Sequence, residues 1–223
     1  MRIAEIFYSI QGEGSLIGVP SVFVRISGCN LRCAWCDTPY TSWKPEGEER
    51  DLEFILERVG GFKGRHVVVT GGEPMIAPEI VALTRRLHEN GRHITIETAG
   101  TVYAPVVCDL MSISPKLANS TPGGRWAAQH ERVRFQPDVL RRLTEHYEYQ
   151  LKFVVTNPED LNEIHAIIEQ LDADRGKVIL MPEGVDASVL RERGIWLAEI
   201  AKCEGFRYSP RLQVDLWGNR RGV

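Results

Sequence analysis

The sequence predicts an α/β protein, an incomplete TIM-type parallel β/α barrel of about six strands. Two observations predict this fold class. Short apolar runs rich in β-branched residues alternate with segments that repeat apolar residues at helical spacing, which is typical of a parallel sheet covered by helices. Eight βα units take about 250 residues, whereas this chain has 223. We therefore expect one domain, residues 1–223, in which the barrel does not close.

The strands are predicted from short runs that end at turn residues. Residues 66–70 (HVVVT) form a continuous apolar run, as buried parallel strands do. Residues 93–97 (HITIE) alternate apolar and polar side chains, and 109–114 (DLMSIS) end at Pro115. The full set of predicted strands is 21–27, 66–70, 93–97, 109–114, 150–156, 177–181 and 206–216.

The helices are predicted from apolar spacing and from their end signals. Residues 51–59 place leucine, isoleucine and valine at helical intervals. Residues 78–90 stop at Gly91, a typical C-cap, and 158–171 open with Pro-Glu-Asp. The full set of predicted helices is 51–59, 78–90, 136–146, 158–171 and 187–203. Residues 116–135 have little periodicity, so we predict a loop there.

Composition narrows the classes of function. The chain is 43% hydrophobic with a formal net charge of −3, which gives no general attraction to nucleic acid or to a membrane surface. No stretch approaches the 18 or so apolar residues that a membrane span needs, and the N-terminus lacks the pattern of a secretory signal. Five cysteines, three of them clustered, fit a reducing compartment. We expect a cytoplasmic protein that binds neither nucleic acid nor membranes.

The most informative motif is the CxxxCxxC run formed by Cys29, Cys33 and Cys36. Three thiolates within eight residues are soft ligands for a thiophilic metal centre, yet a tetrahedral zinc or a four-iron cluster needs a fourth ligand. One interpretation is a structural zinc site completed by a distant residue, such as His66, His88 or Cys108. The other is an enzyme whose fourth position belongs to a ligand that takes part in chemistry.

A second motif, Thr70-Gly71-Gly72-Glu73-Pro74, follows a predicted strand about 35 residues later. By itself it is also explained as a strand-to-helix turn with a glutamate near a helix N-terminus. Together with CxxxCxxC and the preceding aromatic Trp35, it resembles the signature of the radical S-adenosylmethionine (SAM) superfamily. The resemblance implies one 4Fe-4S cluster on the three cysteines, with SAM bound to the fourth iron. It favours the enzyme over the zinc site.

A third segment, Gln11-Gly12-Glu13-Gly14, lies ahead of the cysteines, and Asp37-Thr38 follows them. With Arg25 and Ser114-Pro115-Lys116, this set is similar to the 7-carboxy-7-deazaguanine synthase (QueE) family, and the similarity covers most of the chain. It implies a lyase that converts 6-carboxy-5,6,7,8-tetrahydropterin to 7-carboxy-7-deazaguanine, on the route to queuosine and other 7-deazapurines. No catalytic side chain is implied beyond the cluster and SAM.

The same resemblance implies a role for each matching residue. The pterin substrate would be bound by Ile10, Gln11, Gly12, Glu13, Arg25 and Thr70. SAM would be bound by Trp35, Cys36, Asp37, Gly72, Glu73, Ser114, Pro115 and Lys116, with Glu97 a further candidate for the ribose. Thr38 would bind Mg²⁺, which prefers hard oxygen ligands and keeps its waters. Structural interpretations stay open for Arg25, as an edge-strand arginine, and for Thr38, as a turn residue before Pro39.

The resemblance also implies partners: a reductant protein such as flavodoxin or ferredoxin, and a second copy in a homodimer. One departure concerns the late segment, where Asp215 stands in place of the family's histidine. Substrate contacts from this end of the chain are therefore open. The alternative function is a radical SAM activase that generates a glycyl radical on a partner protein.

Overall fold

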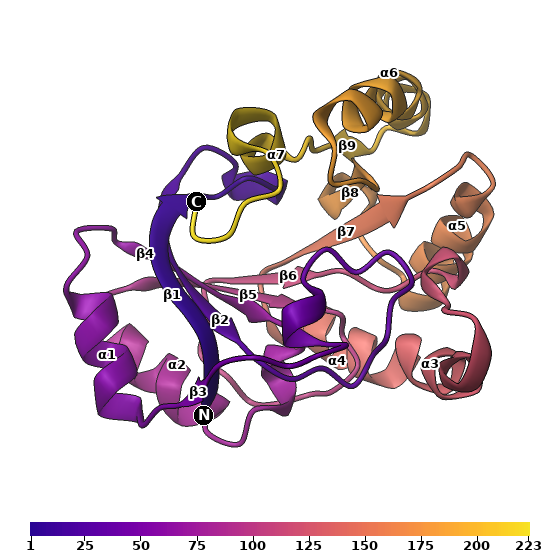
Figure 1. Ribbon diagram of the computed structural model, residues 1–223. Helices are drawn as coiled ribbons and strands as arrows, with labels where there is room; N and C mark the ends of the chain where they lie inside the picture. Colours follow the sequence, from indigo (N-terminus) through magenta and orange to yellow (C-terminus); the bar gives the residue numbers. More distant parts are fainter.

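The apolar runs pair side by side into one curved sheet of nine strands, in the order β3-β1-β2-β4-β5-β6-β7-β8-β9 (Figure 1). This computed structural model describes residues 1–223. The strands are β1 (Arg2–Ile10), β2 (Pro20–Ile26), β3 (Glu48–Glu49), β4 (His66–Gly71), β5 (His93–Thr98), β6 (Leu110–Ile113), β7 (Tyr149–Val155), β8 (Val178–Pro182) and β9 (Arg207–Tyr208).

From β2 to β9 every neighbouring pair is parallel, which confirms the predicted partial parallel barrel. Strands β1 and β3, at one end of the sheet, are antiparallel additions that the sequence did not predict. Strand β1 escaped prediction because its pairing register shifts between Ile3 and Glu5. A shift of this kind breaks the period-two pattern by which a strand is recognised.

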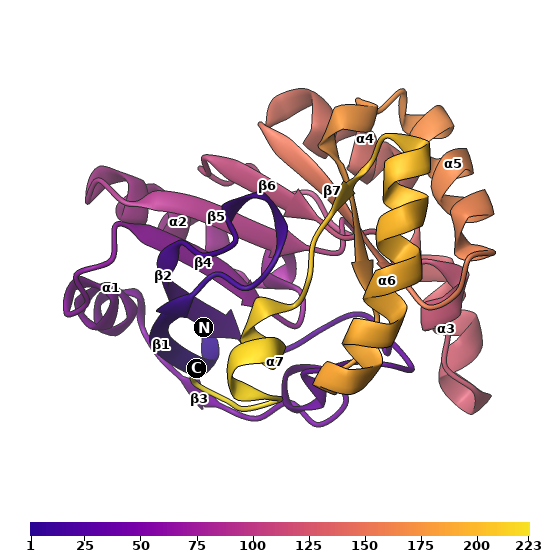
Figure 2. The same cartoon turned by 90° about the horizontal axis from the view of Figure 1, so that it is seen from above.

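The helices are α1 (Leu52–Gly60), α2 (Ile80–Glu89), α3 (Ala127–Arg134), α4 (Pro137–His146), α5 (Asp160–Leu171), α6 (Ala187–Glu204) and α7 (Leu212–Trp217). Most of them cover the outer, convex side of the sheet, whereas α7 lies at its open side, between β1 and α6 (Figure 2). No helix combines the length and apolarity that a membrane crossing requires.

Two sequence predictions are wrong. The predicted loop 116–135 contains helix α3, whose only buried residue is His130. A helix held by so few buried contacts leaves no apolar periodicity in its sequence.

The predicted strand 206–216 is a two-residue strand, β9, followed by helix α7. Leu212, Val214 and Leu216 alternate as in a strand, but only Val214 is buried, and Leu216 is 53% exposed. The chain leaves the sheet after β9, and the Leu212 N–H donates to the Gly12 carbonyl, 3.0 Å away. Helix α7 thus bridges the gap between the two ends of the sheet.

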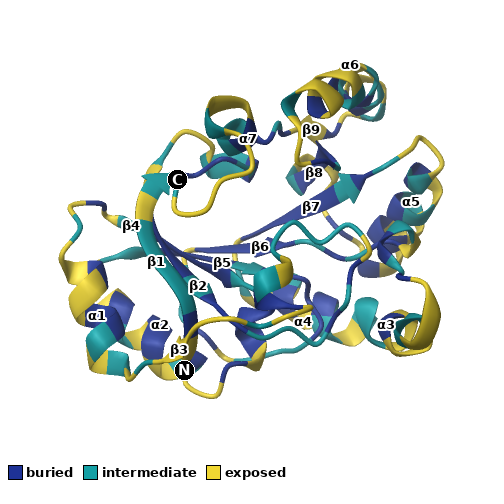
Figure 3. Cartoon of the chain, viewed as in Figure 1, coloured by how far each residue is buried: buried dark blue, intermediate teal, exposed yellow.

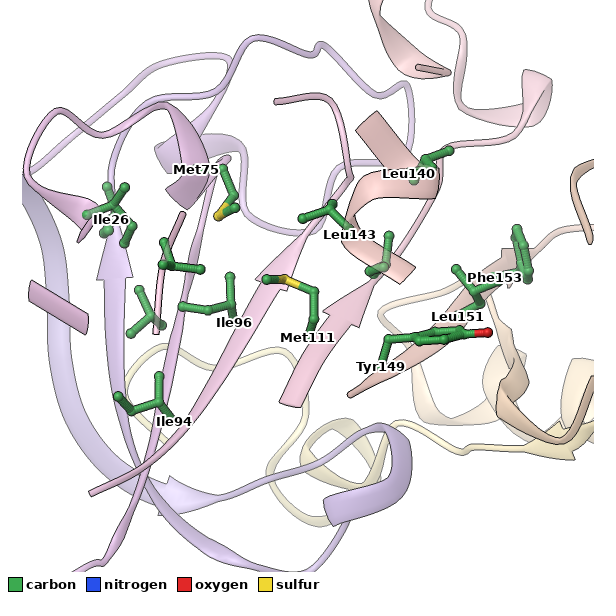
Figure 4. Close-up of a cluster of buried hydrophobic side chains, with 14 of the residues drawn as sticks. Ile26, Met75, Ile94, Ile96, Met111, Leu140, Leu143, Tyr149, Leu151 and Phe153 are labelled. Atoms are coloured by element: carbon green, nitrogen blue, oxygen red, sulfur yellow. The ribbon is translucent and has the colours of Figure 1, made fainter. Parts of the chain in front are cut away.

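The hydrophobic core lies between the sheet and the outer helices, and buried residues occupy the central strands (Figure 3). Ile96 and Met111 project from neighbouring strands towards Leu140 and Leu143 of α4 (Figure 4). Because alternate side chains of a strand face opposite ways, the remaining positions of the same strands face the concave side. This core therefore fixes which side chains line the interior of the barrel.

We expect Leu140→Ala to lower the free energy of unfolding by about 2–5 kcal/mol, because Leu140 is fully buried and its loss leaves a cavity. Urea denaturation measures this change. Asp138→Ala, an exposed site on the same helix, is the matched control and should shift stability by less than about 0.5 kcal/mol. Equal effects of the two variants would contradict this packing.

Candidate active site

A large cavity opens on the concave side of the sheet, where the carboxyl ends of the parallel strands meet. It is walled by the end of β1, the cysteine loop and the segment 218–223. The predicted site residues that line it are Ile10, Gln11, Gly12, Glu13, Arg25, Cys29, Cys33, Trp35, Cys36, Asp37, Thr38, Thr70, Gly72, Ser114 and Lys116. Glu73 and Pro115 do not line it. The fold therefore brings residues from distant parts of the chain into one chamber.

The three cysteines stand together at one corner of this cavity, packed with Leu31 and Ala99. No disulfide joins them, and no group of three His, Cys, Asp or Glu side chains is arranged to hold a single metal ion. The candidate zinc ligands His66, His88 and Cys108 do not line the cavity. Three thiols at one corner of the cavity are suited to bind an iron–sulfur cluster, in which inorganic sulfide supplies the remaining ligands of the iron atoms.

Electrostatics at this corner also favour a cationic occupant. Burial raises the pKa of the Cys29 thiol to about 12, and the pKa of Cys33 to about 11. Repulsion between neighbouring thiolates contributes to these values, from Cys33 and Cys36 at Cys29 and from Cys36 at Cys33. Thiolate ligands at this position therefore need positive charge from bound metal.

Helix α3 and the turns before it hold the cysteine loop in place. The Arg32 N–H donates to His130 Nδ1 at 3.2 Å, and the Ala34 N–H donates to the Ser120 carbonyl at 2.8 Å. The Trp35 indole N–H donates to the Asn119 carbonyl at 3.1 Å. The segment predicted as a loop is thus one wall of the cluster corner.

Glycines bring the GGEP turn close to the cysteine loop. A Cβ on Gly72 would lie 2.1 Å from the Gly28 carbonyl oxygen, so only glycine fits there. The Glu73 N–H donates to the same carbonyl at 2.9 Å. The backbone of this turn therefore borders the cluster corner without side chains in between.

The Glu73 carboxylate points away from the cavity and is fully buried. It accepts hydrogen bonds from Thr98 Oγ1 at 2.7 Å, the Ala99 N–H at 2.9 Å and the Met75 N–H at 3.1 Å. Burial raises its pKa above the usual range, although these hydrogen bonds oppose the rise. The Glu73 side chain therefore links the ends of β4 and β5. In this position it does not contact a ligand in the cavity directly.

Ser114 and Lys116 lie across the corner from the glycines. Lys116 Nζ donates to both the carbonyl and the hydroxyl of Ser114 at 2.8 Å, and it lies 5.9 Å from the centre of the Trp35 ring. A cation, an indole face and a serine hydroxyl are suited to hold an adenosyl group and a carboxylate.

Arg25 lines the cavity and carries an unsatisfied donor. Its Nε atom is buried and has no hydrogen-bond partner, and the nearest carboxylate, that of Glu5, is 3.8 Å away. A buried donor without a partner costs free energy. The forked guanidinium is therefore suited to bind a carboxylate that enters the cavity.

Sequence reasoning missed a network of buried charges around Glu13. Lys152 Nζ lies 2.5 Å from one Glu13 oxygen, while Arg211 Nε and Gln213 Nε2 donate to the other at 3.1 and 2.8 Å. Burial alone raises the pKa of Glu13, but the cations of Lys152 and Arg211 outweigh this and hold it well below its usual range.

The network joins the two sides of the cavity. Arg211 also pairs with Asp37, directly after the cysteine motif, and donates to the Gly184 carbonyl. Lys152 lies 3.6 Å from Glu97, which accepts from Thr70 Oγ1 at 3.0 Å and Gln11 Nε2 at 3.3 Å. Glu97 therefore lies with the predicted substrate residues.

One signal could have revealed Lys152, which is the only charge within an otherwise apolar strand (QLKFVVT). Arg211 gave no such signal, since the two carboxylates with which it pairs lie more than 170 residues away in the sequence.

We expect Glu13→Gln to lower the free energy of unfolding by about 3–5 kcal/mol at neutral pH, because it removes the carboxylate that the two buried cations Lys152 and Arg211 share. The pKa of Glu13 is depressed in the fold, so its contribution is complete above its unfolded value near 4.5 and declines as the pH falls below that value. Denaturation from pH 7 to pH 3 measures this, and the free-energy difference between the variant and the wild type should shrink as the pH falls below about 4.5.

Glu145→Gln, at an exposed position outside the cavity, serves as the control and should change stability little at any pH. A constant difference between Glu13→Gln and the wild type across this range would contradict the assigned charge pairing.

Comparison with known proteins agrees with this site. The Radical SAM superfamily profile matches residues 23–117. The 7-carboxy-7-deazaguanine synthase of Rhodopirellula baltica is 46% identical over 100% of this chain and 89% of its own length. That of Halobacterium salinarum is 44% identical over 98% of this chain and 91% of its own.

A solved structure gives the same result. The crystal structure of QueE from Escherichia coli aligns with a TM-score of 0.72 at 28% identity, covering 95% of this chain and 93% of that one. With its cysteine corner, its glycine turn and these full-length similarities, the chain belongs to the 7-carboxy-7-deazaguanine synthase family of radical SAM enzymes.

Proposed function

We propose that this enzyme converts 6-carboxy-5,6,7,8-tetrahydropterin to 7-carboxy-7-deazaguanine, with ring contraction and loss of ammonia. One observation carries the proposal. The residues that match the family's substrate segment, including Gln11 and Arg25, line the same cavity as Cys29, Cys33 and Cys36. A pterin bound in this cavity would lie next to the corner that the three cysteines form.

The cofactors follow from the radical SAM family. The three cysteines would hold one 4Fe-4S cluster, and the GGEP backbone, Trp35 and Lys116 would hold SAM. When bound, the cluster and SAM supply a radical that removes a hydrogen atom from the substrate and later returns it.

The side chains of the chain itself bind and orient the substrate. Arg25 would take the substrate carboxylate, since its Nε is buried without a partner. Gln11, Gly12 and Glu13 would bind the edge of the pterin ring, and Ile10 and Thr70, which line the same cavity, would also contact it. Holding the reacting carbon at the radical source is catalysis by positioning.

Mg²⁺ would bind at Thr38, whose side chain lines the cavity two residues beyond Cys36. A single neutral hydroxyl is a weak ligand, so the substrate carboxylate and waters would complete the octahedral shell. The ion would then orient the substrate carboxylate.

We extend the proposal to the setting of the enzyme. Residues 1–223 would act as a single radical SAM core domain in the cytoplasm, as a homodimer, with electrons from a small protein such as flavodoxin or ferredoxin. The product would enter queuosine or other 7-deazapurine synthesis. No observation favours a glycyl-radical activase.

Anaerobic reconstitution with iron and sulfide, followed by SAM, reductant, Mg²⁺ and carboxytetrahydropterin, tests the function. We expect 7-carboxy-7-deazaguanine and ammonia in equal amounts. Cys33→Ala should abolish turnover because it removes one of three cluster ligands, and its iron content should fall. Cys203→Ala, at an exposed thiol outside the cavity, is the control and should behave as the wild type. A wild-type enzyme that forms no deazaguanine under these conditions would refute the function.

Thr38→Ala should weaken the response to magnesium while leaving cluster assembly intact. We expect the Mg²⁺ concentration for half-maximal rate to rise about tenfold, since loss of a residue that supports a metal ion's ligands typically costs 10- to 100-fold in metal affinity. Titration of the rate with Mg²⁺ measures this. If the magnesium dependence of the rate were unchanged, the assignment of Thr38 as a magnesium ligand would be wrong.

A further inference from the structure

The proposed reaction leaves one chemical demand that the cluster and SAM do not meet. Expelling a nitrogen as ammonia requires a proton to reach that nitrogen and another to leave a ring carbon. This inference rests on the proposed function. It concerns the groups in the cavity that can move those protons.

Most polar groups of the cavity are unsuited to this task. None of the six histidines of the chain lines it. Arg25 and Arg211 hold their protons too tightly to release them. Lys116 directs its ammonium at Ser114, beside the cluster corner. The Tyr40 ring lies beneath the Arg221 guanidinium, on the side of the cavity formed by residues 218–223.

Lys152 is placed differently. It projects from the middle of β7 into the cavity, its side chain is only 6% exposed, and it lies between the carboxylates of Glu13 and Glu97. Burial lowers its pKa, but these two carboxylates raise it above the ordinary value, so the resting side chain is an ammonium. A substrate that draws Glu13 to itself would weaken this hold and make the ammonium a stronger acid.

We propose that Lys152 donates the proton with which ammonia leaves, and that Glu97 accepts the proton lost from the ring carbon. As Glu97 removes that proton, the C–H electron pair forms a ring double bond and the C–N bond breaks. The nitrogen keeps the bonding pair and takes a proton from Lys152, leaving as neutral ammonia. One proton leaves carbon and one reaches nitrogen, so the step needs no oxidant or reductant.

The distance between Lys152 and Glu97 also allows the two side chains to return to their resting protonation states. Glu97 would then be a neutral acid and Lys152 a neutral amine, with Oε1 and Nζ 3.6 Å apart. Passage of one proton across this separation restores the resting charges. The chain thus contains a complete proton cycle within its cavity.

Two variants at one position separate proton donation from charge. Lys152→Arg keeps a buried cation beside Glu13 but cannot release a proton at neutral pH, whereas Lys152→Met removes both. Each variant receives substrate deuterated at its ring carbons, and three quantities are followed: deuterium in recovered SAM, ammonia, and acid-quenched species of substrate mass. Lys202→Met, an exposed lysine on α6, is the control.

For Lys152→Arg we expect deuterium transfer within about threefold of the wild type, ammonia release slowed by about 10²- to 10⁴-fold, and a ring-contracted isomer of substrate mass. Pterin affinity of the cluster-free variant should be unchanged. Lys152→Met should show the same block wherever it retains the cluster.

Two results would overturn the proposal. One is ammonia release by Lys152→Arg within threefold of the wild type, which would reduce Lys152 to a counter-charge. The other is parallel loss of deuterium transfer and ammonia release, which would make it a positioning residue. Failure of the wild type to form deazaguanine is a separate result, because it refutes the proposed function itself.

Discussion

The buried ion pairs around Glu13 are the interaction on which the rest of this site depends. An incomplete barrel cannot close its interior with strand pairing, because its two ends do not meet. Here the gap is spanned by charges, since Glu13 follows β1 whereas Arg211 follows β9. Such charges are expensive to bury alone but stable when paired and hydrogen-bonded. The pairing therefore fixes the shape of the cavity as well as its charge.

Arg211 extends this constraint to the cluster corner through Asp37. Arg211 thereby connects the cysteine loop to the turn around Glu13, which is proposed to bind the substrate. Helix α3 contacts the loop from its other side. Radical chemistry requires the hydrogen donor and the radical source to be held at a fixed distance. A network that joins both supports meets that requirement through packing and charge, without a closing domain.

Sequence reasoning reached the fold class, and most of the site residues that it predicted line the cavity, because both follow from local signals. Buried parallel strands are recognised in the sequence as apolar runs, and the CxxxCxxC and GGEP motifs occur directly after such runs. Apart from β1, whose register shift interrupts its pattern, the failures share one cause, which is dependence on distant partners. Helix α3 is held by contacts to the cysteine loop and lacks apolar periodicity. Helix α7 is held by a contact to Gly12, and its apolar residues alternate as in a strand. Lys152 and Arg211 became visible only when the fold paired them with Glu13.

A double-mutant cycle between Glu13 and Arg211 tests the central claim most directly. The free energy of unfolding is measured for the wild type, Glu13→Gln, Arg211→Met and the double variant. If the pair spans the barrel opening as described, the two substitutions are strongly coupled, by about 1–3 kcal/mol. Effects that add to within about 0.5 kcal/mol would show that the two side chains act independently, and would contradict this account.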